Sequence, residues 1–197
     1  ILIVEDESII AIHIKKILKL KGYADVEIAS SEDEVFVRIE KNKPDLILMD
    51  IILEGSNDGI LIVENLKKTY DIPIIYLTAH SDEATINRAK TTEPYGFIVK
   101  PINKYDLYTA IEIALYKHSM ERKLRNSEEK YRNLIESVND IVYSTDDEAI
   151  ISFISSRVES LLGYQAFDLI GRPLVKYIYK EDIKLIDEFL SNNTKVH

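Results

Sequence analysis

Short apolar segments alternate with helical patterns through the first part of the chain, and this alternation constrains the fold more than any other feature. The apolar segments are apolar throughout and rich in β-branched residues, as strands buried on both faces are. Their residue ranges are 1–5, 24–29, 45–50, 73–79 and 95–100. The alternation predicts a doubly wound α/β domain, with five parallel strands and helices on both faces of the sheet.

Charged or hydroxyl residues stand where these strands end. Glu5 and Asp6 follow the first strand, and Asp50, Thr78 and Lys100 end the third, fourth and fifth. The carboxyl ends of parallel strands share one edge of a sheet, where ligands bind. Three close carboxylates repel one another unless a cation intervenes, and oxygen ligands favour Mg²⁺. An ionised Asp beside such an ion can form an aspartyl phosphate, whose oxygens Lys100 and Thr78 would hold.

The same residues carry a family resemblance. Glu5-Asp6, Asp50, Thr78-Ala79 and Lys100-Pro101 resemble, in this order, the signature of the receiver domain of two-component response regulators. We expect that domain to cover residues 1–118. The resemblance implies a flavodoxin-like fold with strand order 2-1-3-4-5, and Asp50 as the residue phosphorylated from the phosphohistidine of a sensor histidine kinase.

The resemblance also implies metal ligands and switch residues. The ligands of Mg²⁺ (or Mn²⁺) would be Glu5, Asp6, Asp50 and the backbone carbonyl of Ile52. Thr78 corresponds to the switch hydroxyl, which moves toward the phosphoryl group. Phe97, three residues before Lys100, corresponds to the switch aromatic, which then turns inward.

A helical linker is predicted over residues 119–136. The stretch 121–132 mixes both charge signs and contains neither Gly nor Pro, as exposed helices do. A heptad seam with 4-3-4-3-4 spacing runs through Met120, Leu124, Ser127, Tyr131, Leu134 and Val138. This seam predicts a homodimer through residues 113–138. His118 lacks the flanking residues of a kinase phosphoacceptor box, so we assign it no such role.

Residues 137–197 resemble the N-terminal part of a PAS sensory domain. Two predicted strands, 140–146 and 149–155, precede short helices and the segment "DLIGRPL". This incomplete α+β domain has no Cys and no His before His197, so we expect neither a His-ligated haem nor a Cys-linked flavin. Its aromatic side chains are expected in the core: Tyr143, Phe153, Tyr164, Phe167, Tyr177 and Tyr179.

Composition limits the partners and the location. The net charge of -9 argues against nucleic-acid binding by this segment. No run reaches the roughly 18 to 20 apolar residues that span a bilayer, so no membrane is expected. The chain has no cysteine, which fits a cytoplasmic protein.

These features predict a response regulator that passes a change at Asp50 through the linker to the PAS domain. We expect no enzymatic activity in this chain beyond Mg²⁺-dependent self-phosphorylation on Asp50. One alternative is the receiver–PAS part of a larger hybrid sensor histidine kinase, with its kinase domain beyond residue 197. A phosphatase of the haloacid-dehalogenase type is disfavoured, because Ile52 stands where that class needs a second Asp.

Overall fold

The computed structural model describes residues 1–53, 58–79, 83–179 and 181–182. It divides into two compact units, residues 1–123 and 124–197. The first unit alternates strands and helices in the order β1 (Leu2–Val4), α1 (Ser8–Lys21), β2 (Glu27–Ala29), α2 (Glu32–Lys41), β3 (Ile47–Asp50), α3 (Gly59–Lys67), β4 (Ile74–Thr78), α4 (Glu83–Lys90), β5 (Gly96–Val99) and α5 (Lys104–Ser137).

The five strands form one parallel sheet in the order β2-β1-β3-β4-β5, which confirms the predicted fold class. The strands are shorter than the apolar segments that predict them. The sequence pattern marks burial, and residues such as Leu46 are fully buried although they lie outside the bounds of a strand.

Two apolar layers hold the helices on the sheet. Side chains from α2, α3 and α4 pack on one face, together with Val4, Met49 and Tyr76. Side chains from α1 and α5 pack on the other face, with Ile3, Leu48 and Ile75. Because neighbouring strand residues point to opposite faces, both faces are apolar and covered, as the uninterrupted apolar segments predict.

Local signals set the helix ends near the sheet. Ser31 caps α2 by accepting a hydrogen bond from the Glu34 backbone N–H. Gly22 ends α1 in a left-handed conformation with φ of 107°, which an L side chain adopts only with strain. These caps fix where the chain leaves α1 and where it enters α2.

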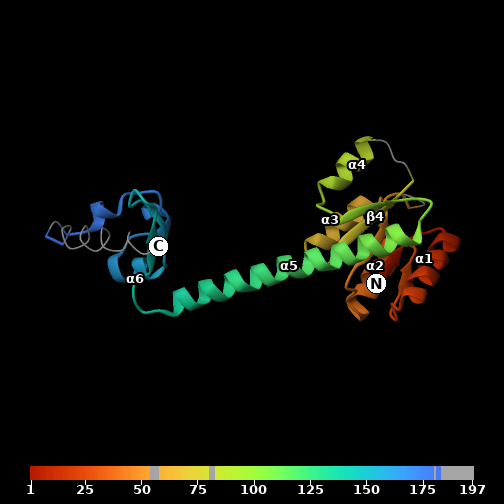
Figure 1. The fold of residues 1–197 in the computed structure, drawn as a ribbon, viewed down its shortest axis with the longest axis horizontal. Coiled ribbons are helices and arrows are strands. Elements are labelled where there is room, and N and C mark those ends of the chain that lie inside the picture. Colours follow the sequence, from red (N-terminus) through yellow and green to blue (C-terminus); the bar gives the residue numbers. More distant parts are fainter. Residues whose placement is uncertain (54–57, 80–82, 180, 183–197) are drawn as a thin grey trace. The chain divides into compact units, whose positions relative to one another are not determined.

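The helix α5 is one continuous helix from Lys104 to Ser137 (Figure 1). Its N-terminal part belongs to the first unit, where Leu107, Ile111 and Ala114 are fully buried. Its C-terminal part carries the predicted linker. Among the described residues, no helix combines the length and the apolar composition that crossing a membrane requires.

The second unit contains a small hairpin and short helices. The antiparallel strands β6 (Tyr143–Thr145) and β7 (Ile151–Ile154) precede α6 (Arg157–Leu162), α7 (Ala166–Leu169) and the 3-10 helix η1 (Leu174–Tyr177). The Asp146 carboxylate accepts hydrogen bonds from the backbone N–H groups of Glu148 and Ile150 and so shapes the hairpin turn. Residues 183–197 of the predicted PAS part lie outside the described residues.

The prediction of an aromatic core in this second unit is wrong. The buried cluster is aliphatic and small, and consists of Ile151, Ile154, Val158 and Leu169. Of the six aromatic residues, Tyr177 packs against this cluster, whereas four are exposed: Tyr143, Tyr164, Phe167 and Tyr179. The cluster takes its buried side chains from β7, α6 and α7, and four of the six rings lie outside it.

Candidate metal and phosphoacceptor site

The carboxyl edge of the sheet brings together side chains from three strands. Glu5 directly follows β1, Asp50 is the last residue of β3 and Lys100 directly follows β5. The parallel register aligns these ends, and the Lys100 backbone N–H donates to the Thr78 carbonyl at 2.7 Å. The ladder therefore places residues that are up to 95 positions apart in sequence at one edge.

Lys100 joins two of the carboxylates. Its Nζ lies 2.7 Å from Asp50 Oδ2 and 2.7 Å from Glu5 Oε2. The side chains are 13% exposed for Lys100, 8% for Asp50 and 0% for Glu5. Apart from this ion pair, Glu5 Oε2 has no hydrogen-bond partner among the described residues. A buried carboxylate in that position needs the ammonium or another cation for compensation.

Burial acts on the pKa values of both Glu5 and Lys100. Burial raises the pKa of Glu5 to about 7; Lys100 acts against this rise and the charge of Asp50 adds to it. For Lys100, burial lowers the pKa, but the hydrogen bonds and charges of Asp50 and Glu5 outweigh it, so the pKa is raised. The site therefore holds its lysine charged, and burial disfavours the charged form of Glu5.

The acidic residues fit a divalent cation. Glu5, Asp6 and Asp50 each offer a carboxylate oxygen, and these atoms lie within 4.8 Å of one another. Hard oxygen donors at such spacing suit Mg²⁺, which keeps several waters and takes one or two carboxylates directly. The Ile52 backbone N–H donates to Asp50 Oδ1 at 3.3 Å, so the predicted ligand carbonyl belongs to a residue hydrogen-bonded to the cluster.

Thr78 lies on β4, the neighbour of β3, and Phe97 lies on β5, the next strand along the sheet. Thr78 ends β4 and is 3% exposed, and β4 runs between β3 and β5 in the sheet. Phe97 pairs with Tyr76 across β4 and β5, and the two rings stack with centroids 5.7 Å apart. The structure thus gathers Glu5, Asp6, Asp50 and Lys100 directly, and places Thr78 at the same edge.

Gly59 supports the site in a way that the sequence reasoning missed. A Cβ built on Gly59 would lie 1.9 Å from the Asp50 carbonyl oxygen. The Gly59 N–H donates to the Ile51 carbonyl at 3.1 Å, and Asp58 caps α3 while its other oxygen pairs with Arg88 of α4. The signal was the Asp-Gly pair at the start of α3, which combines an N-cap residue with the only side chain small enough for this approach.

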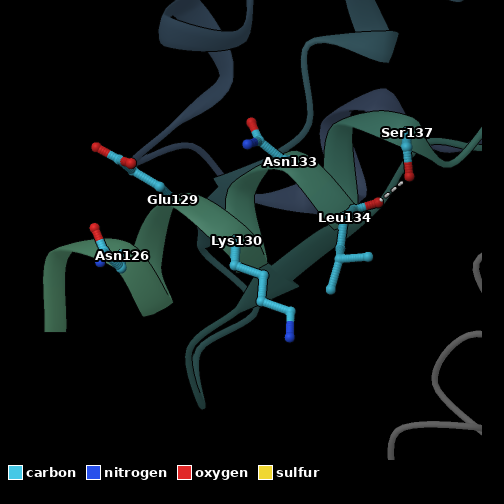
Figure 2. A pocket seen from close by; sticks show the side chains of 6 residues that line it. All are labelled: Asn126, Glu129, Lys130, Asn133, Leu134 and Ser137. Atoms are coloured by element: carbon cyan, nitrogen blue, oxygen red, sulfur yellow. Dashed lines mark hydrogen bonds between the residues drawn. The ribbon is translucent and has the colours of Figure 1, made fainter. Parts of the chain in front are cut away.

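A hollow along α5 is not a comparable site. Its lining consists of Asn126, Glu129, Lys130, Asn133, Leu134 and Ser137 (Figure 2). Figure 2 shows these side chains pointing in several directions from one helix, with Ser137 bonded back to the Leu134 carbonyl. Because one helix supplies every lining group, they do not converge on a shared ligand position.

Comparison with known proteins identifies the first unit. The family model described as response regulator receiver domain matches residues 1–112, which is more than half of the chain. The chain belongs to the response regulator receiver family. A second model, described as PAS fold, matches residues 129–194. The receiver domain is therefore followed by a PAS region, as the sequence predicted.

Individual relatives agree with this assignment. The receiver is similar to the transcriptional regulatory protein PdtaR of Mycobacterium tuberculosis, with 34% identity over 58% of this chain and 56% of PdtaR. It is likewise similar to the phosphate regulon transcriptional regulatory protein PhoB of Escherichia coli, with 34% identity over 58% of this chain and 51% of PhoB. This chain thus spans about half the length of the curated relatives it matches.

Solved structures show the same domain. The signal receiver domain of a modulated diguanylate cyclase from Desulfovibrio desulfuricans G20 has a TM-score of 0.57 and 32% identity, covering 61% of this chain and 95% of that one. The N-terminal domain of a response regulator/sensory box/GGDEF 3-domain protein from Carboxydothermus hydrogenoformans has a TM-score of 0.56 and 33% identity. The match covers 61% of this chain and 96% of that one. Receiver domains bind Mg²⁺ in an acidic pocket and accept phosphoryl groups from histidine kinases, and Glu5, Asp6 and Asp50 form that pocket here.

We predict that Gly59→Ala lowers the free energy of unfolding of the receiver by about 1–3 kcal/mol, as overpacking against a backbone atom does. Urea denaturation monitored by circular dichroism measures this free energy of unfolding for the wild type and the variant. The matched control is Gly96→Ala, where an added Cβ has nothing within 4 Å. Equal effects of the two substitutions would contradict the close approach at Asp50.

Proposed function

We propose that Asp50 accepts a phosphoryl group from a sensor histidine kinase in a Mg²⁺-dependent phosphorelay. The observation that carries the proposal is the position of Lys100 Nζ, 2.7 Å from Asp50 Oδ2, within a cluster of three carboxylates. A lone structural Asp–Lys pair would not need the further acids Glu5 and Asp6 beside it. Family membership supports the donor class.

The chemistry uses few protein groups. An Asp50 carboxylate oxygen attacks the phosphorus, and the bond from phosphorus to the donor imidazole nitrogen breaks. The Lys100 ammonium can move from the carboxylate to the phosphoryl oxygens, where charge accumulates. Glu5, Asp6, Asp50 and the Ile52 carbonyl would hold Mg²⁺, which when bound neutralises charge on the phosphoryl group.

Thr78 and Phe97 are proposed as the switch. A phosphoryl group on Asp50 adds charge and hydrogen-bond acceptors at the edge where Thr78 ends β4. A new hydrogen bond to the Thr78 hydroxyl would draw the end of β4 toward Asp50. Phe97, half-buried against Tyr76 on the neighbouring strands, is then free to move inward. Phosphorylation so shifts the population of two arrangements of β4 and β5.

The proposed order of parts is a receiver over residues 1–118, a linker over 119–136 and a PAS part over 137–197. The change at Asp50 would pass along α5 to the PAS part. Several matched relatives are named transcriptional regulators, and they are about twice the length of the matched segment. The acidic charge of -9 supports the view that the residues present here do not themselves bind nucleic acid. We place the protein in the cytoplasm, which its cysteine-free sequence fits.

We further propose a homodimer through residues 113–138. The apolar members of the heptad seam are exposed on α5 and just after it, with 61% exposure for Leu124, 65% for Tyr131 and 53% for Leu134. A second copy of the same helix would cover this stripe, because the 4-3-4-3-4 spacing matches the seam of a two-stranded coiled coil. Met120 and Val138 extend the stripe in both directions.

The phosphoacceptor proposal predicts the result of an intact-mass measurement with Mg²⁺ and a small acyl phosphate. The wild type gains one phosphoryl group, and Asp50→Asn gains none, because the amide cannot act as the nucleophile. Circular dichroism checks that the variant folds. Uptake by Asp50→Asn equal to that of the wild type would contradict the assignment of Asp50.

The dimer proposal predicts a change in sedimentation. At tens of micromolar, the wild type sediments as a dimer and Leu124→Lys as a monomer, because the charge would be buried at the seam. Tyr116→Lys is the control, since Tyr116 is 67% exposed on α5 and outside the seam. A monomeric wild type, or a dimer that Leu124→Lys leaves intact, would contradict the proposal.

A further inference from the structure

The side of α5 that packs on the receiver changes character after Ala114. Up to that residue it is apolar, with Leu107, Ile111 and Ala114 fully buried. One helical turn after Ala114 the same side carries His118, and about one turn after His118 it carries Glu121. His118 remains well covered, with a side chain 12% exposed. Polar contacts therefore replace apolar packing where α5 leaves the receiver.

Tyr95 is the centre of these contacts. Its hydroxyl donates a hydrogen bond to Glu121 Oε2. Its ring meets the His118 ring edge to face, with centroids 5.7 Å apart and planes at 87°. On another side, the Lys117 ammonium lies 5.4 Å from the ring centroid. One side chain thus contacts three residues within little more than one turn of α5.

His118 provides a second attachment. Its Nε2 lies 3.0 Å from Asp71 Oδ1, in the connection that precedes β4. The segment of α5 at the boundary between receiver and linker is therefore attached at two places, through His118 to Asp71 before β4 and through Glu121 to Tyr95 before β5.

The strand β5 connects these contacts to the phosphoacceptor site. Tyr95 immediately precedes β5, and Lys100 immediately follows it. The four-residue strand between them is at the edge of the sheet, and among the described strands it pairs with β4. One end of β5 is held by the ion pairs of Lys100 with Asp50 and Glu5, and the other end by the contacts of Tyr95 with α5.

We propose that Tyr95, His118 and Glu121 form a clamp through which β5 controls the start of the linker helix. When Lys100 moves from Asp50 toward a phosphoryl group, β5 shifts and Tyr95 changes its hold on Glu121 and His118. This inference rests on the phosphorylation of Asp50 proposed above. A purely structural anchor would hold α5 in the same way whatever the state of Asp50. The two possibilities therefore differ in whether hydrogen–deuterium exchange at residues 117–123 responds to phosphorylation.

The experiment is hydrogen–deuterium exchange of the whole chain, followed in peptides that cover residues 117–123. Tyr95→Phe removes only the hydroxyl, and exchange in these peptides is expected to rise about fivefold, as loss of one hydrogen bond implies. Tyr116→Phe, the same change at an exposed position on α5, leaves exchange unchanged. Peptides from α2 serve as an internal reference for global stability.

The coupling is tested by changing the far end of β5. In the wild type, treatment with Mg²⁺ and a small acyl phosphate is expected to change hydrogen–deuterium exchange at residues 117–123. The substitution Lys100→Met is expected to change exchange at the same residues without any phosphodonor. In Tyr95→Phe, both changes in exchange are expected to fall to less than half of their size in the protein with Tyr95. If exchange at residues 117–123 responds to neither treatment, the clamp is overturned.

Intact mass of the same samples separates the two proposals. Phosphoryl uptake without any change in the linker peptides would overturn the clamp and leave the phosphoacceptor role in place. No uptake, together with a response of residues 117–123 to Lys100→Met, would support the coupling of β5 to α5 but overturn phosphorylation of Asp50 as its trigger, and with it the proposed function.

Discussion

The ion pairs of Lys100 with Glu5 and Asp50 are the interaction on which the site depends. Two carboxylates that are almost fully covered face one ammonium at 2.7 Å each, and a third carboxylate, that of Asp6, lies close by. Without a cation, their mutual repulsion and desolvation would cost several kcal/mol. The lysine supplies one charge for three acids, so it compensates their charge only in part.

This arrangement also explains why the residues stand where they do in the sheet. Strands that are buried on both faces can carry charged residues only at their ends. Because the strands are parallel, their carboxyl ends all lie at one edge of the sheet. Asp50 is therefore compatible with a strand whose other residues are fully buried. The edge strand β5 brings Lys100 to the same point, with Thr78 on the strand between them.

The strand order 2-1-3-4-5 came from the resemblance to receiver domains. The sequence itself was sufficient for the sheet and for the residues of the acidic cluster, because strand ends follow directly from the apolar pattern. It was insufficient for Gly59 and Tyr95. Their roles come from contacts between different elements: Gly59 of α3 with the carbonyl of Asp50 in β3, and Tyr95 with Glu121 of α5, which is 26 residues away. No local periodicity encodes such contacts. The aromatic residues of the second unit were misjudged for a related reason, because composition alone does not give the volume of a core.

The most direct test of the account is a Mg²⁺ titration of the full chain, followed by backbone amide chemical shifts in NMR spectra. The account predicts saturable shifts centred on Glu5, Asp6, Asp50, Ile52 and Lys100, and much weaker binding in Asp6→Asn, which removes one carboxylate from the cluster. Saturable shifts confined to other residues, or the same affinity in Asp6→Asn, would contradict it.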